Sequence, residues 1–96
     1  MPSFRVTVAI GALRPGVRPD AVLPAAADAA ADLTVVEASS VDVVRREARL
    51  TVRYTADTVD EAIAVAEHTV ERVGSLAQTG AWAVTERVGG RWFRRA

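Results

Sequence analysis

Apolar and polar residues alternate from Phe4 to Ile10, so Phe4, Val6, Val8 and Ile10 are expected on one face of a strand. Two stretches have helical spacing instead: the Ala-rich segment after Pro19, and Val59–Val73. Three more runs alternate as strands do: Thr34–Val44, Ala48–Tyr54 and Trp82–Val88. The resulting order of strand, helix, strand, strand, helix, strand predicts an α+β domain.

The second helical stretch has the clearest start signal. Thr58 and Glu61 have the spacing of a capping box, in which the hydroxyl and the carboxylate satisfy free backbone amides at the helix start. Gly74 is expected to cap the other end. The first helix has two plausible starts: with Asp20 as N-cap, or near Leu23 with Pro24 at the first helical position.

Turn-forming residues separate these elements. Gly11–Pro19 is expected to be a long connection, and Ser39–Ser40 to mark a bulge. Arg45–Glu47 predicts a tight turn between two strands. Gly89–Gly90 favours a two-residue hairpin, which would make Arg91–Arg95 a short fifth strand at the sheet edge.

This order matches the ferredoxin-like βαββαβ sandwich, an antiparallel sheet with two helices on one face. Residues 1–96 are expected to form a single domain, since 96 residues fit one modest core. The core is predicted to contain Val6, Val8, Leu50, Val52, Ile63, Ala66, Val70 and Val84.

Composition narrows the function classes. The chain has 12 basic and 12 acidic residues and no cysteine, which removes bulk attraction to nucleic acid or membrane and excludes disulfides and thiolate metal sites. No run approaches the roughly 20 apolar residues of a transmembrane helix. A cytoplasmic location is therefore the default expectation. All basic residues are arginines, whose forked donors suit carboxylates and phosphates.

Few residues offer catalytic chemistry. His68 is the only histidine, and is expected at the surface near Arg72. Acidic pairs at helical spacing, such as Asp28 with Asp32, are interpreted as solvated faces. No phosphate-loop or nucleophile motif is present. The sequence therefore favours a protein without catalytic residues, metal or cofactor.

The sheet face opposite the helices is the main functional candidate. If strands one and three are neighbours, Arg5, Arg49 and Arg53 should lie close together, while the second helix is acidic on its outside. The face is predicted to carry Arg5, Thr7, Ala9, Arg49, Thr51, Arg53, Ala83, Thr85 and Arg87.

Three interpretations of this face stay open: a merely solvated surface, a self-association surface, or an anion or nucleic-acid site. We expect a non-catalytic interaction or oligomerisation module that forms a homodimer, or binds a protein partner, through this face or the C-terminal edge. The alternative is a sensor or small enzyme that binds a small anionic ligand between protomers. Nucleic acid and membrane are disfavoured as partners. The candidate binding residues are Arg5, Arg49, Arg53, Arg87, Arg91 and Trp92.

Overall fold

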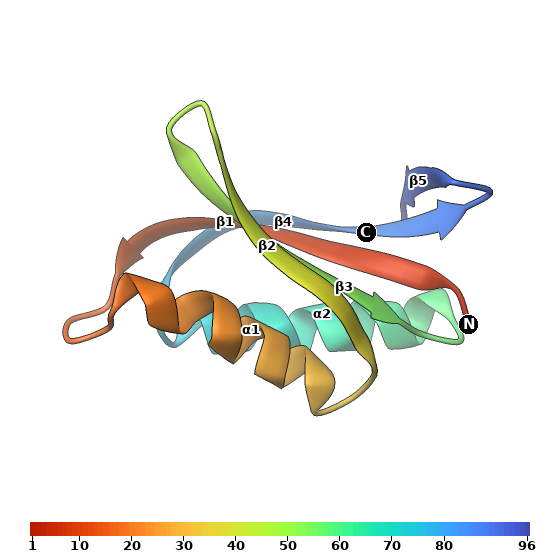
Figure 1. Cartoon of the computed structure of the whole chain (residues 1–96), viewed down its shortest axis with the longest axis horizontal. Helices are drawn as coiled ribbons and strands as arrows, with labels where there is room; N and C mark the ends of the chain where they lie inside the picture. Colours follow the sequence, from red (N-terminus) through yellow and green to blue (C-terminus); the bar gives the residue numbers. More distant parts are fainter.

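The computed structural model describes all 96 residues, and its helices and strands follow one another in the expected order. The chain forms an α+β fold with two α-helices and a five-stranded antiparallel sheet (Figure 1). The elements are β1 (Ser3–Leu13), η1 (Pro19–Ala21), α1 (Val22–Ala31), β2 (Val36–Val44), β3 (Glu47–Thr55), α2 (Val59–Gly74), β4 (Ala77–Val88) and β5 (Arg91–Arg94).

The sheet has the strand order β2-β3-β1-β4-β5, so β2 and β5 are its edges. β1 lies in the middle and pairs with β3 on one side and β4 on the other, with Val6 opposite both Val52 and Val84. The short fifth strand expected from the Gly-Gly pair is confirmed. No helix is both long and apolar enough to cross a bilayer.

The core forms between one face of the sheet and both helices. Phe4, Val6 and Val8 from β1 are buried on this face, as are Leu50, Val52 and Tyr54 from β3. The helices complete the cluster mainly with small side chains, which allow close approach to the sheet. The buried helical residues in the cluster are Val22, Ala26, Ala30, Ala62, Val65, Ala66 and Val73.

Two predicted core residues, Ile63 and Val70, are only half-buried. α2 instead turns Ala62, Val65 and Thr69 inward. The rest of the predicted core is buried as expected. The Tyr54 hydroxyl donates a hydrogen bond of 2.6 Å to the Ala62 carbonyl, which connects this part of α2 to β3.

The two ends of α2 agree only in part with the ends predicted from the sequence. The Thr58 hydroxyl accepts a bond from the Glu61 amide at 3.1 Å, which confirms the N-cap, while the Glu61 carboxylate accepts from the Asp57 amide. The prediction for Gly74 is wrong: it is the last helical residue, and Ser75 is the C-cap in a right-handed conformation. A left-handed glycine is therefore not needed at this end.

The first helix begins at Val22, close to the predicted start near Leu23, but Pro24 is its third residue and not its first. A single 3₁₀ turn, η1, precedes α1, whose N-cap is Ala21. Pro24 therefore lies in the first turn of α1, where a missing N–H costs no helical hydrogen bond. The chain thus uses Pro19 and Pro24 without breaking a helix.

β1 and β4 are longer than predicted. Gly11–Leu13, expected as part of a connection, continues β1, and β4 begins at Ala77. Two register shifts, between Val8 and Ile10 and between Ile10 and Leu13, keep this end of the ladder paired. The alternation of apolar and polar residues is lost at such irregularities, and this explains why the sequence predicted shorter strands.

Candidate functional site

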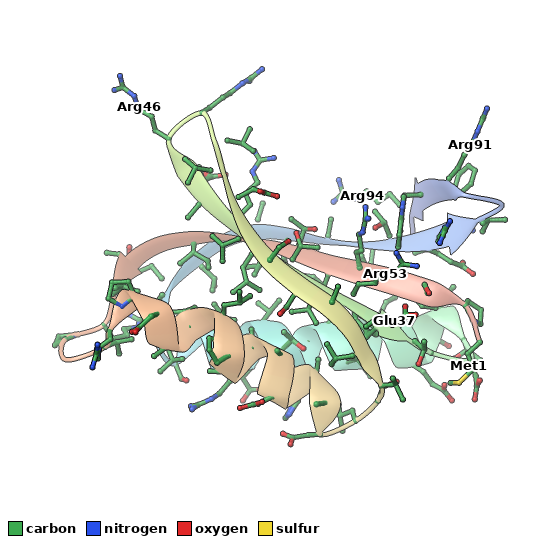
Figure 2. All side chains as sticks on the ribbon, viewed as in Figure 1. Met1, Glu37, Arg46, Arg53, Arg91 and Arg94 are labelled. Atoms are coloured by element: carbon green, nitrogen blue, oxygen red, sulfur yellow. The ribbon has the colours of Figure 1, made fainter.

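A row of arginines crosses the sheet on the face away from the helices. Arg53 of β3 lies opposite Arg5 of β1, Arg5 lies opposite Thr85 of β4, and Thr85 lies opposite Arg94 of β5. Arg53 and Arg94 project from this face in Figure 2. Like charges on adjacent strands repel, so this row requires compensating groups.

Trp92 supplies one such group. The tight turn at Gly89–Gly90 sets Trp92 opposite Arg87 on the open face, and the indole ring extends over β4 toward β1. The Arg5 guanidinium lies 3.8 Å from the ring centroid, and that of Arg53 lies 5.3 Å away. The indole therefore lies against both cations, and the C-terminal hairpin forms part of the open face.

Glu37 supplies the second compensating group. The register between β2 and β3 shifts between Val36 and Ala38, and the extra residue turns its carboxylate onto the open face. One carboxylate oxygen accepts a bond of 2.6 Å from the Ser3 hydroxyl and one of 3.2 Å from Arg53 Nε. The pKa of Glu37 is lowered mainly by the Ser3 hydrogen bond, with Arg53 adding to the effect.

No residue pattern identified Glu37 in advance. The bulge was predicted at Ser39–Ser40, but that part of β2 pairs regularly with β3. Arg94 was also missing from the candidate set, although a signal existed. A two-residue turn at Gly89–Gly90 fixes the pairing of β4 with β5, and alternation then sets Trp92 and Arg94 on one face.

Three candidate residues lie away from the Arg5–Arg53 pair. The prediction that Arg49 joins this pair is wrong, because Arg49 lies opposite Ala9. Arg49 and Arg53 are four positions apart along β3, a distance of about 13 Å. Arg49 forms an exposed ion pair of 3.3 Å with Glu47.

The other two candidate residues, Arg87 and Arg91, lie toward the β4–β5 turn. Arg87 is exposed on the open face opposite Trp92, and its charge helps to lower the pKa of Glu37. Arg91 extends from the start of β5 away from the sheet (Figure 2). Arg87 therefore belongs to the site, whereas Arg91 lies at its margin.

The open face has two shallow hollows. One, of about 280 Å³, is lined by Arg5, Arg53, Ser40 and Thr51, together with Ala38, Ser39 and Asp42. The second, of about 220 Å³, lies near Arg49, Arg94 and Trp82. Both are open to solvent, so neither is a deep, enclosed cleft.

The helical side offers less chemistry. His68 Nε2 lies 3.4 Å from an Asp32 carboxylate oxygen across the two helices. These residues and Arg72 line a surface groove of about 450 Å³, which agrees with the expected position of His68 near Arg72. No group of three or more His, Cys, Asp or Glu side chains is arranged to hold a metal ion.

Comparison with known proteins adds no relative: no protein-family model, curated protein or solved structure matches this chain. The arrangement of Arg5, Arg53, Glu37 and Trp92 is therefore the basis for any functional conclusion.

Proposed function

We propose that this protein is a small non-catalytic interaction module, and that its open sheet face binds a protein partner through exposed carboxylates. The observation that carries the proposal is the state of Arg5. Arg5 is half-buried and its guanidinium lies over the Trp92 ring, yet it takes part in none of the protein's ion pairs. A cation held in this way is available to an external anion.

The stacking prepares Arg5 for this role. An indole against one face of the guanidinium leaves the N–H groups at its edge free, and those groups bind a carboxylate with two parallel hydrogen bonds. The side chain is also ordered before binding, which lowers the entropy lost on association. Arg53 adds a second cation opposite Arg5, although Glu37 neutralises part of its charge.

The shape and charge of the face favour an acidic protein over a second copy. A two-fold contact through this face would oppose two surfaces that each carry more arginines than carboxylates, which is unfavourable. A face whose hollows are shallow and open to solvent suits a protein partner better than an enclosed small molecule.

A small anionic ligand is the second candidate. The 280 Å³ hollow favours it, because two guanidinium groups and the hydroxyls of Ser40 and Thr51 line one depression. Asp42 lines the same hollow and opposes an anion there. This candidate therefore ranks below the protein partner.

We also infer that the fold is a variant of the ferredoxin-like plan. The order β2-β3-β1-β4 of the first four strands supports this assignment, as does the burial of both helices in one core cluster. β5 extends that plan at the β4 edge.

A hexaglutamate peptide tests the proposed function. In a Trp82→Phe background, Trp92 is the sole tryptophan, and its fluorescence reports events beside Arg5. We expect the peptide to shift this emission at low salt. Arg5→Gln should weaken peptide binding about tenfold or more, since it removes a charged hydrogen-bond donor.

Arg18→Gln is the matched control: it makes the same charge change at an exposed residue that pairs only with Asp20 near η1. Its affinity for the peptide should stay unchanged. A peptide that does not bind, or one that binds Arg5→Gln as well as wild type, would refute the protein-partner proposal. Inorganic phosphate in the same titration tests the second candidate.

A further inference from the structure

Exposed apolar side chains are concentrated in one segment of the chain. Eight large hydrophobic residues are exposed, and five of them fall between Leu33 and Val44, in β2 and the residues just before it. Single exposed apolar residues need no explanation, but neighbouring ones on an uncovered strand indicate a contact surface. Leu33 and Val35 lie just before β2, whereas Val41, Val43 and Val44 lie together toward its C-terminal end.

This segment is also a free edge of the sheet. β2 pairs only with β3, so the N–H and C=O groups along its other side have no strand partner. Natural edge strands are usually protected by lysine, proline, bulges or a covering element. The β2 bulge occurs at its start, and the strand pairs regularly with β3 from Ala38 to Val44.

The helices leave the outer part of β2 uncovered. In Figure 1 the β2–β3 hairpin rises beyond the helical layer. Val41 and Val43 lie opposite Leu50 and Ala48, on the face that points toward the helices in the rest of the sheet. Nevertheless Val43 is 72% exposed. An apolar side of an unpaired strand is therefore left in solvent.

We propose that β2 pairs antiparallel with β2 of a second copy, which joins the two sheets across a two-fold axis. The occupant is a second copy because the strand is self-complementary in charge. Arg45 and Arg46 lie at its C-terminal end, whereas Asp32 and Glu37 lie at or before its start. Antiparallel pairing sets the cationic end of each strand beside the anionic end of the other.

The register follows from the same charges. Centring the axis on Val41 places Val41 beside its own counterpart. It also brings Arg45, in the turn after β2, toward Glu37 at the bulge of the other copy, where Arg45 would join Arg53 as a second cation. Centring it on Asp42 would oppose two carboxylates. Centring it on Ser40 would leave Arg45 opposite Val35. The Val41 register is thus the one that satisfies both apolar and charged groups.

The turn at the hairpin tip fits this role. Arg45 and Arg46 have φ angles of 52° and 68°, in the left-handed region that costs non-glycine residues stability. Asn-Gly would fit such a turn with less strain. Both arginines adopt this backbone conformation although it is unfavourable for them. Their charges therefore lie at the tip of the hairpin, and Arg46 extends from it in Figure 2.

Molar mass in solution tests the dimer. Light scattering on the full chain from low to high micromolar concentration should show a concentration-dependent dimer. Val41→Lys and Val43→Lys should each give a monomer, because a buried unpaired charge would enter the shared edge. Val88→Lys is the matched control: Val88 is an exposed valine at the end of β4, and its variant should still dimerise.

A wild-type chain that stays monomeric at the highest concentration would overturn the proposal. So would a dimer that survives both β2 substitutions. Circular dichroism of each variant shows whether it is folded, and both β2 sites are exposed enough to accept lysine.

Cross-linking tests the register. The chain has no native cysteine, so Val41→Cys introduces a single thiol. Facing positions across an antiparallel pair lie within disulfide distance, and mild oxidation should yield a covalent dimer. Val88→Cys should not. Equal cross-linking of the two variants, or cross-linking of Val88→Cys alone, would contradict pairing through β2.

Discussion

Tyr54 is the residue that connects the sheet most directly to α2. Its ring is fully buried beside Phe4, with 6.3 Å between the ring centroids, and its hydroxyl donates to the Ala62 carbonyl. Burial raises the pKa of Tyr54, because the phenolate would lose its hydration. One side chain thus provides packing, a hydrogen bond and a pH-dependent contribution to stability.

That contribution can be isolated because the chain has no lysine or cysteine and only one tyrosine. The unfolded chain releases the phenol proton near pH 10, whereas the folded chain retains it. Stability should therefore fall as pH rises above 10, by up to about 1.4 kcal/mol per pH unit. Tyr54→Phe should cost about 1 kcal/mol at neutral pH and abolish this alkaline loss.

Urea unfolding of both proteins at neutral and alkaline pH measures the difference. An equal alkaline loss in wild type and Tyr54→Phe would contradict the assignment. The absorbance of tyrosinate gives an independent readout, since it should appear only as the wild-type protein unfolds.

At the scale of elements, two hairpins with the same kind of turn differ in sequence. The β4–β5 turn places Gly89 and Gly90 at φ angles of 58° and 84°, and the β2–β3 turn places two arginines in the same region. A Cβ at Gly90 would meet no atom within 4 Å, so a substitution there adds conformational strain without a clash. The pair allows a reciprocal experiment.

We expect Arg46→Gly to raise the free energy of unfolding by about 1 kcal/mol and Gly90→Ala to lower it by a similar amount. Both variants should carry Val43→Lys, so that the proposed dimer does not contribute to stability. Urea unfolding gives the two values. Changes of the same sign would show that backbone strain does not dominate at these turns.

At the scale of the molecule, the net charge is zero but the charged side chains are unevenly distributed over the surface. The open face carries a row of three arginines across neighbouring strands, while the outer side of α2 exposes Asp60, Glu61, Glu67 and Glu71. β5 adds Trp92 and Arg94 to the open face and contributes no fully buried side chain. The last strand therefore extends the binding surface more than it stabilises the core.

A chain that ends at Val88 should accordingly stay folded, with a lower Tm and nearly unchanged far-ultraviolet circular dichroism. It should bind hexaglutamate about threefold more weakly or worse, because Arg5 loses its indole support and the Arg94 charge is absent. Calorimetric titration measures this, and Trp92→Ala in the full chain separates the loss of stacking from the loss of the strand. Unchanged affinity in both proteins would remove Trp92 from the site.

Much of this arrangement follows from local sequence. Alternation with a period of two determines that Arg5 and Thr7 share a face, and likewise Thr51 and Arg53, whatever the strands pair with. The capping box at Thr58 and the turn at Gly89–Gly90 depend on neighbouring residues alone. These features were predictable because their energetics involve only a few adjacent residues.

The contacts that form the site depend on pairing between distant segments. The bulge that turns Glu37 toward Ser3, the separation of Arg49 from Arg5, and the stacking of Trp92 on Arg5 all depend on interstrand register. So does the uncovered edge of β2, since helix length and sheet twist determine where the helical layer ends. Local alternation is enough to predict which side chains each strand can present. Which of those side chains meet depends on long-range packing, because the register is set by the packing of the whole sheet on its helices.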